Sequence, residues 1–500
     1  MKLGRDQSAR HPEVFEGSPR KSSSVKAPAS ENVTPFSWRR RRSHDAVSFE
    51  IPRQARDDGE DRGNIEASYL VESGSRTAPA GMLAESGEAV RTMGQSAGSS
   101  STSGRTLVVG QSGGATAVIN ASLVGVVDGA LASGAFDRVR GMRHAIEGLI
   151  AGNMVDLGGL GREMLAGLLR TPSSALGTGR YKLKEGDLDR VVERLAELDA
   201  GAMVYIGGND SADTAHRLHE QSRDAGRDLR VVSVPKTVDN DLPATDHCPG
   251  YPSMARFLAN TVRDATYDSL ASPTLYPVKI VEVMGRDAGW VAAAAMLGFS
   301  AAEADLLPLI YLPERRPASA EAAVAEIEAR VAERGFVVVV LPETLRDADG
   351  RHFGGDEPED VDPFGHPYFP STGVALARLV TTSTGHRARY EKPGSAARMS
   401  ISLASRVDLE EAYALGRSAA ERVAHDESDI MTSITREADD PYIWSVGAAP
   451  LARVANHVRA VPDGYIGDDG RSMTDAFRTY AMPLLGRDPF PPYTRLPLES

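Results

Sequence analysis

Short apolar runs that end in glycine-rich or charged turns recur along this chain, with helix-compatible segments between them. The runs are continuous in Val, Ile and Leu, which is typical of strands buried on both faces of a parallel sheet. We therefore expect an α/β fold of doubly wound β/α units. The expected strands are 106–110, 202–206, 229–234, 278–283, 306–311 and 336–341, and the expected helices are 188–198, 253–270, 288–299, 319–334 and one from about residue 117.

The first 104 residues lack this pattern. They are rich in Ser, Gly, Arg and Pro and end in the run SSSTSG, a composition typical of disorder. We expect a disordered N-terminal extension over 1–104, and Met82 or Met93 is an alternative start of translation. The four arginines at 39–42 are followed by no apolar core of the kind that an export signal needs.

The composition excludes several classes of protein. The chain has 56 basic and 69 acidic residues, so its net charge of −13 favours neither nucleic acid nor an anionic membrane. No apolar stretch approaches the roughly 20 residues that cross a bilayer. A single cysteine, Cys248, forms no internal disulfide and no cysteine metal cluster. We expect a cytoplasmic protein whose anionic ligands are bound by local groups.

Five loops that follow expected strands carry most of the chemically active residues. Residues 105–500 are too many for one comfortable core, so we expect two lobes. Because the carboxyl ends of parallel strands gather the ligand-binding turns, these loops are expected to meet in one cleft between the lobes. The loops are 110–114, 207–211, 235–241, 284–287 and 342–343.

Two of these loops are suited to a phosphate and its metal ion. The loop 110–114 (GQSGG) has bare backbone N–H groups before a helix, which suits an anion, although such a turn is often only a turn. Asn209 and Asp210 follow two glycines and offer oxygen ligands to Mg²⁺. The alternative is that Asp210 or Ser211 merely caps the next helix.

The loop 235–241 (PKTVDND) is the most specific of the five. A carboxylate beside a substrate hydroxyl can take its proton, and a lysine can neutralise charge on a phosphoryl group in flight. The alternative is a solvated polar turn. Arg286, Arg389 and Arg398 add guanidinium groups that suit a sugar phosphate, although Arg286 alone is equally compatible with a surface ion pair.

Taken in order, these motifs resemble the phosphofructokinase family over residues 106–436. The resemblance implies the phosphofructokinase-like fold of two doubly wound β/α lobes with parallel-type sheets and an active site in the cleft. It also implies a donor lobe of 105–250 plus about 397–447 and a sugar-phosphate lobe of 251–396 plus about 448–500. The matching segments are GQSGGATAVINA from Gly110, LGTGRYK from Leu176, YIGGNDS from Tyr205, VPKTVDND from Val234, VEVMGRDAGW from Val281, VVVVLPE from Val337 and KPGSAARMS from Lys392.

The resemblance implies a role for each site residue. Asp239 is the expected general base on the C1 hydroxyl of fructose 6-phosphate, and Thr237 the contact to the transferred phosphoryl group. The expected sugar-phosphate ligands are Met284, Gly285, Arg286, Glu343, Arg389, Ser395 and Arg398, of which Arg389 often reaches in from a neighbouring subunit in the family. The expected donor ligands are Gly113, Arg180, Tyr181, Asp210 and Lys236, and the expected Mg²⁺ ligands are Asp210 and Asn209.

Two positions predict the phosphoryl donor. ATP-using relatives have glycine at both, whereas this chain has Asp210 and Lys236. A carboxylate at the first position repels the α-phosphate of ATP, and a lysine at the second can hold free pyrophosphate. We expect reversible, Mg²⁺-dependent transfer from pyrophosphate to fructose 6-phosphate, giving fructose 1,6-bisphosphate and phosphate for glycolysis or gluconeogenesis. ATP as donor and a catalytically silent regulatory subunit of the same fold are the alternatives.

Three residues depart from the family pattern. Asn209 replaces a metal-binding aspartate, Pro277 replaces a substrate arginine, and Ser395 replaces a His or Tyr. A larger ketose such as sedoheptulose 7-phosphate therefore stays an alternative acceptor. No duplicated half is present, which favours simple kinetics without allosteric control, and the family's shared active sites imply a homodimer or homotetramer.

Overall fold

The structure, a computed structural model, describes residues 106–179, 181, 183–184, 186–362, 365, 367–487 and 489–496. The extension expected over 1–104 and the donor residue Arg180 lie outside the described residues. Within the part of the chain that is described, no helix is long and apolar enough to span a membrane.

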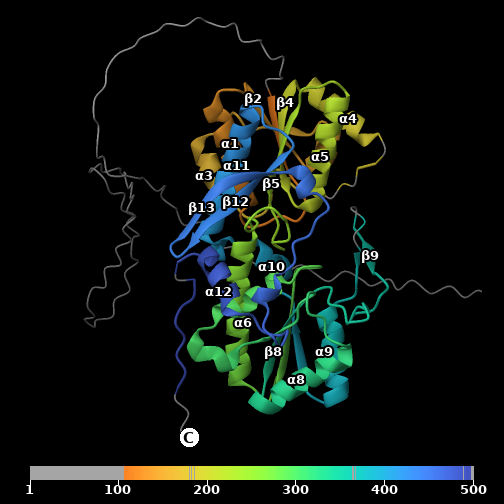
Figure 1. Cartoon of the computed structure of the whole chain (residues 1–500), viewed down its shortest axis with the longest axis vertical. Coiled ribbons are helices and arrows are strands. Elements are labelled where there is room, and N and C mark those ends of the chain that lie inside the picture. Colours follow the sequence, from red (N-terminus) through yellow and green to blue (C-terminus); the bar gives the residue numbers. More distant parts are fainter. Residues whose placement is uncertain are drawn as a thin grey trace, which may run out of the picture. The chain divides into compact units, whose positions relative to one another are not determined.

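Seven strands form the first sheet, in the order β13-β12-β5-β4-β1-β2-β3 (Figure 1). Its centre is parallel, as predicted, and β12 also pairs parallel with β5. The two edges are antiparallel, β2 with β3 and β12 with β13, and the turn between β12 and β13 is too short for a parallel crossover. The strands are β1 (Thr106–Gln111), β2 (Arg138–Met142), β3 (Met154–Asp156), β4 (Ala200–Gly207), β5 (Arg230–Pro235), β12 (Ile430–Asp439) and β13 (Tyr442–Pro450).

Helices cover both faces of this sheet, which explains the continuous apolar runs. In β1, Leu107 and Val109 pack with α1, α3 and α11, whereas Val108 packs with α2, α4 and α5 on the opposite face. These helices are α1 (Ile119–Ser133), α2 (Ala145–Ile150), α3 (Arg162–Leu168), α4 (Asp187–Glu197), α5 (Asn209–Asp224) and α11 (Arg406–Ala424).

Four parallel strands form the second sheet, in the order β11-β6-β8-β7. It too is covered on both faces: Val338 and Val340 pack with α6 and α12, and Val337 and Val339 with α8 and α9. The elements are β6 (Val278–Val283), β7 (Leu309–Ile310), β8 (Val337–Pro342), β11 (Ala388–Glu391), α6 (Tyr251–Ala271), α7 (Trp290–Ala293), α8 (Ala320–Arg334), α9 (Thr372–Thr384), α10 (Gly394–Met399) and α12 (Asp475–Ala481).

Two expected elements are shorter than predicted. The strand expected over 306–311 is only β7, because a 3₁₀ helix with a capping box of Ser300 and Glu303 occupies the chain up to Leu306. The helix expected over 288–299 is α7 followed by a 3₁₀ helix. The short elements are η1 (Ala294–Gly298), η2 (Ala301–Leu306), η3 (Ile401–Leu403), η4 (Leu451–Arg453), η5 (Asp463–Tyr465), η6 (Met482–Leu485) and the antiparallel pair β9 (Asp360–Val361) and β10 (Pro367–Tyr368).

The chain returns to the first sheet after completing the second. Helix α11 packs against α1 at backbone distance, since a Cβ on Gly416 would lie 2.0 Å from the carbonyl oxygen of Ser122. A Cβ on Gly125 would lie 2.1 Å from the carbonyl oxygen of Tyr413. Larger side chains at either glycine would force the two helices apart. Beyond β13, α12 and η6 bury Phe477 and Leu484 in the core of the second sheet.

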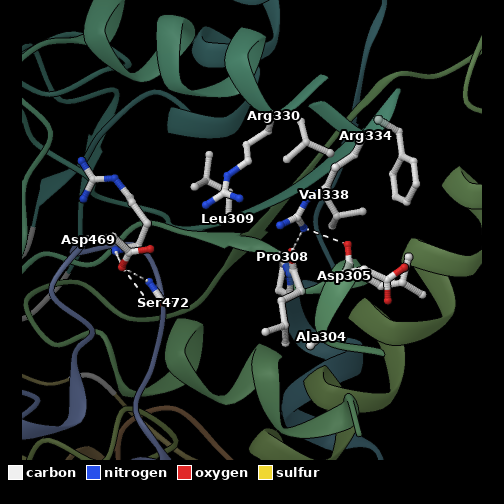
Figure 2. Close-up of a pocket in the computed structure, with 14 residues that line it drawn as sticks. Ala304, Asp305, Pro308, Leu309, Arg330, Arg334, Val338, Asp469 and Ser472 are labelled. Carbon is white, nitrogen blue, oxygen red and sulfur yellow. Dashed lines mark hydrogen bonds between the residues drawn. The ribbon is translucent and has the colours of Figure 1, made fainter. Parts of the chain in front are cut away.

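A small cavity of about 100 Å³ lies at the amino ends of β7 and β8 (Figure 2). Arg330, Arg334 and Arg471 line it. Arg334 donates a hydrogen bond to the carbonyl of Asp305 at 2.9 Å, and Arg471 is paired with Glu326 at 2.6 Å. The strands are parallel, so this cavity lies at the opposite end of the sheet from the loops that carry the predicted site.

Candidate active site

A cavity of about 580 Å³ joins the loops that follow the carboxyl ends of β1, β4, β5, β6 and β8. This is the edge at which a doubly wound sheet binds its ligands. The structure brings most of the predicted site residues together there. Those that line the cavity are Gly113, Asn209, Asp210, Lys236, Thr237, Asp239, Met284, Arg286, Glu343, Ser395 and Arg398.

The glycine loop after β1 lies against two cations. A Cβ on Gly113, whose φ is +73°, would stand 3.2 Å from the Lys236 ammonium, and a Cβ on Gly114 would stand 2.9 Å from the Arg398 guanidinium. Lys236 is only 3% exposed, and its backbone N–H donates to Gly207 at the end of β4. The loop therefore offers an anion a bare backbone with a buried ammonium beside it.

Asn209 uses both ends of its amide for structure. Its Nδ2 donates to the carbonyl of His457, and its Oδ1 accepts from the N–H of Asn456 at 2.6 Å. Asp210 is thus the more suitable of the two predicted metal ligands. The described residues contain no group of three or more His, Cys, Asp or Glu side chains that could hold an ion. One carboxylate with no protein cage fits a hard cation that arrives with phosphate oxygens.

The loop after β5 holds two carboxylates at the cavity. Asp239 and Asp241 both line it, and the backbone N–H of Asp239 donates to the Thr237 hydroxyl at 3.1 Å. Burial, and then the charges of Asp241 and Glu343, raise the pKa of Asp239 to about 7, against the opposing pull of Arg286 and Lys236. Burial also raises the pKa of Asp241. A carboxyl with a pKa near neutral is suited to accept a proton during a reaction.

Asn240 lies between these two carboxylates and is fully buried. Its Nδ2 donates to the Tyr480 hydroxyl at 3.2 Å, and its Oδ1 accepts from the N–H of Cys248 at 2.9 Å. The side chain of Asn240 points into the protein interior, whereas Asp239 and Asp241 on either side of it line the cavity. The amide therefore anchors the turn that presents both carboxylates.

The loops after β6 and β8 form the other side of the cavity. Thr344 donates to the carbonyl of Arg286 at 2.6 Å, and the N–H of Glu343 donates to Val283 at 3.0 Å, so the two loops are held together. Gly285, with φ +116°, turns the chain between Met284 and Arg286. This side presents one guanidinium and one carboxylate, a combination that suits a phosphorylated polyhydroxyl ligand.

Four predicted residues are not among those that line the cavity: Gly285, Tyr181 and Arg389 lie elsewhere, and Arg180 lies outside the described residues. Tyr181 does not line the cavity, since its hydroxyl donates to Asp187 at 2.9 Å. Arg389 lies over the ring of Tyr276 at 5.1 Å and pairs with Glu391. Arg180 is not described.

An ion pair between a buried glutamate and an exposed lysine, and a hairpin, line the cavity without having been predicted. Glu282, fully buried in β6, accepts from Lys392 at 2.6 Å, and the Lys392 ammonium also lies 3.8 Å from Glu343. Burial lowers the pKa of Lys392, but the hydrogen bond and the charge of Glu282 outweigh burial, so that the pKa is raised. Further lining residues are Ser211, Thr344, Ser371 and, from the β9 and β10 hairpin, Glu359, Asp362, Pro367, Tyr368 and Phe369.

The sequence profile described as Phosphofructokinase matches residues 106–421. The chain belongs to the phosphofructokinase family. The match covers every strand that lines the cavity, so the resemblance inferred from the motifs is confirmed. Solved structures agree with the predicted phosphofructokinase-like fold. A pyrophosphate-dependent phosphofructokinase from Nitrosospira multiformis is 34% identical with a TM-score of 0.70, covering 78% of this chain and 94% of that one.

Three relatives match this chain over most of their own length. The pyrophosphate–fructose 6-phosphate 1-phosphotransferase of Methylococcus capsulatus is 38% identical over 391 residues, 77% of this chain and 92% of the relative. The protein of the same name from Xanthomonas campestris is 37% identical over 404 residues, 78% of this chain and 96% of the relative. A sulfofructose kinase of Alkalicoccus urumqiensis is 30% identical over 361 residues, 72% of this chain and 91% of the relative.

Proposed function

We propose that the protein transfers a phosphoryl group reversibly from pyrophosphate to the C1 hydroxyl of fructose 6-phosphate. The products are fructose 1,6-bisphosphate and phosphate. The observation that carries the proposal is the position of Lys236, buried beside Gly113 at one cavity that also contains Asp210 and Asp239. The names of the relatives from Methylococcus and Xanthomonas support the same activity.

Asp239 and Lys236 divide the chemistry of the transfer. The carboxylate of Asp239 takes the proton of the C1 hydroxyl as that oxygen forms its bond to phosphorus. The bond from phosphorus to the bridging oxygen breaks, and phosphate leaves. The ammonium of Lys236 and the hydroxyl of Thr237 stabilise the charge on the moving phosphoryl group. Because Asp239 returns the proton in the reverse direction, the same groups serve both directions.

The remaining residues bind the two ligands. Gly113 and Asp210 would contact pyrophosphate. Arg180 and Tyr181 are proposed for the donor side on the basis of the LGTGRYK motif alone, since Tyr181 does not line the cavity. Met284, Gly285, Arg286, Glu343, Ser395 and Arg398 would hold the sugar phosphate. Arg389 would serve the same ligand in a neighbouring subunit, which is a reason to propose a homodimer or homotetramer.

Mg²⁺ is the proposed cofactor, held by Asp210 and by oxygens of the donor. A divalent ion at this position would offset the negative charge of pyrophosphate. Asn209 would orient the loop through its bonds to 456 and 457. The cytoplasm is the proposed location, and it rests on the single cysteine of the chain.

We also propose a division of the chain into a donor lobe, 105–250 plus about 397–447, and a sugar-phosphate lobe, 251–396 plus about 448–500. The pairing of β12 with β5 supports assigning the returning segment to the donor lobe. The burial of α12 with the core of the second sheet supports assigning the C-terminal segment to the other lobe.

Aldolase-coupled turnover of the full-length chain tests the proposed function. Fructose 6-phosphate and Mg²⁺ are supplied with either pyrophosphate or ATP, and activity is expected with pyrophosphate alone. Activity with ATP alone would overturn the donor assignment. Inactivity with both donors would favour another acceptor, such as sedoheptulose 7-phosphate, or the silent regulatory subunit.

The double variant Asp210→Gly with Lys236→Gly tests why pyrophosphate is the donor. Removing the carboxylate opens space for the α-phosphate of ATP, and removing the ammonium weakens the hold on free pyrophosphate. The ratio of kcat/KM values for the two donors is expected to move toward ATP. A ratio equal to that of the wild type would exclude these two residues as the determinants.

A further inference from the structure

Arg459 encloses the turn that carries the two cavity carboxylates. Its guanidinium donates four hydrogen bonds to three backbone carbonyls. Nε and Nη2 donate to the carbonyl of Asn240, at 3.2 and 2.8 Å. Nη1 donates to the carbonyl of Thr245, at 2.8 Å, and to that of Asp246. Its backbone N–H donates to the carbonyl of Asp241 at 2.7 Å. One residue, more than 200 positions away in the sequence, therefore satisfies four carbonyls of the segment 240–246.

This segment needs an external restraint. Asn240 and Ala244 have φ values of +55° and +63°, a left-handed conformation that is costly for alanine and less so for asparagine. Such a conformation persists only where surrounding contacts over-determine it. The carbonyl of Asn240, the first of these two left-handed residues, accepts from both Nε and Nη2 of Arg459.

Arg459 also contacts the helix that follows the loop on the opposite side of the cavity. Its carbonyl accepts from the indole N–H of Trp290 at 3.0 Å, and its guanidinium lies 4.7 Å from the centre of that ring. Trp290 begins α7, four residues after Arg286, and is 2% exposed. The same arginine thus contacts the turn of Asp239 and the helix that follows the loop of Arg286.

We propose that Arg459 is a positioning residue of the transfer reaction. It holds the carboxylate of Asp239 at a fixed position relative to the sugar-phosphate loop that precedes Trp290. The inference rests on the proposed function, since it assigns Arg459 to the geometry of that reaction. Arg459 does not line the cavity and so acts through the backbone of 240–246. A displacement of the base by about 1 Å is enough to cost roughly 100-fold in rate.

Arg478 provides a matched control. It is also half-buried, and it also donates to backbone carbonyls, those of Met296 at 3.2 Å and Phe299 at 2.8 Å. Its partners belong to η1 and its C-cap, not to the turn of Asp239. Arg459→Met and Arg478→Met remove the same chemical group, so both are expected to lower the unfolding temperature.

Steady-state kinetics in both directions separates the two variants. Arg459→Met is expected to lower kcat by about 10- to 100-fold, with KM for pyrophosphate changed by less than about twofold, because Gly113 and Lys236 are anchored independently. Arg478→Met is expected to keep the wild-type kcat. Arg459→Lys should recover only part of the loss, since an ammonium cannot bridge Asn240 and Thr245 as the planar fork does.

Hydrogen exchange of the folded variants gives a readout that does not depend on activity. The amides of 237–249 are expected to exchange faster in Arg459→Met than in Arg478→Met at the same temperature. Equal kcat losses in the two variants, or a wild-type kcat in folded Arg459→Met, would overturn the positioning role. If the wild type is inactive but the amides of 237–249 exchange faster in Arg459→Met, the proposed function is overturned. The restraint of the turn by Arg459 would still be supported.

Discussion

The ammonium of Lys236 lies within contact distance of Gly113, so that a Cβ on the glycine would stand 3.2 Å from the lysine Nζ. The two residues follow different strands, β1 and β5, which are separated by β4 in the sheet. A side chain at residue 113 would therefore occupy the space between the loop backbone and the cation.

Gly113→Ala is expected to raise KM for pyrophosphate by about 10-fold. The added methyl group would displace the Lys236 ammonium and weaken its proposed hydrogen bond to pyrophosphate. The φ of +73° also adds backbone strain. Gly134→Ala is the control, because Gly134 has φ +65° with nothing within 4 Å of its Cβ position. Both variants should lose about 1 kcal/mol in urea unfolding. Equal KM values in the two would remove Gly113 from the donor site.

Asp239→Asn is expected to lower kcat by about 100- to 10,000-fold, since the amide cannot accept the hydroxyl proton. The variant should be at least as stable as the wild type at pH 8. The reason is that the pKa of Asp239, about 7 in the folded protein, lies above the unfolded value near 4, so the charged form destabilises the fold. Near-normal turnover in a folded variant would remove Asp239 from the role of base.

The pH profile reports on the neighbours of Asp239. In the wild type, kcat/KM for fructose 6-phosphate is expected to fall below about pH 7, as the base becomes protonated. Asp241→Asn removes a repelling charge and should move this acid limb to lower pH. Titration of the substrates is the same for both proteins, so the comparison cancels it. An unmoved limb in Asp241→Asn would show that Asp239 does not set it.

His247 is expected to make the stability of the protein pH-dependent. Its two ring nitrogens face two carboxylates, the partly buried Asp246 at 2.8 Å and the fully buried Glu411 at 2.6 Å. Burial lowers the pKa of His247, but the charge of Glu411 and the hydrogen bonds of both carboxylates outweigh it and raise it to about 9. The folded value exceeds the unfolded value of about 6.5, so this stabilisation is complete below pH 6.5 and is lost as the pH rises through 9.

Urea unfolding of wild type and His247→Gln at pH 6.5 and 9 measures that contribution. The variant should lose about 3–5 kcal/mol at pH 6.5, because the substitution leaves the buried carboxylate of Glu411 without its cation, whereas Asp246 keeps its ion pair with Arg436. The difference between the two proteins should shrink at pH 9. A constant difference at both pH values would contradict a charged His247.

The residues that follow buried strands could be placed from the sequence. Lys236, Asp239 and Arg286 each lie within a few residues of the end of a predicted strand, and a strand end is a local feature. The alternation of strands and helices then requires those ends to meet at one edge. The α/β class, the expected edge for the site and the resemblance to the family could therefore be predicted from the sequence alone.

Contacts between side chains that are distant in the sequence could not be predicted from the sequence. Glu282 and Lys392 are 110 positions apart, and Arg459 is 219 positions from Asn240. Nothing in the apolar pattern of a strand reveals that a glutamate within β6 is buried against a lysine after β11. Tyr181 was assigned to the donor through a motif, yet its hydroxyl donates to Asp187.

The sequence by itself determined the element types, the glycine turns and the chemical character of each loop, because these depend on neighbours within a few residues. Only the tertiary structure decided the proximity of Gly113 to Lys236, the elevated pKa of Asp239 and the grip of Arg459 on the turn. The first two depend on strand ends from distant parts of the chain lying side by side in the sheets. The third depends on the returning segment, which brings Arg459 back to a turn 219 residues earlier in the chain.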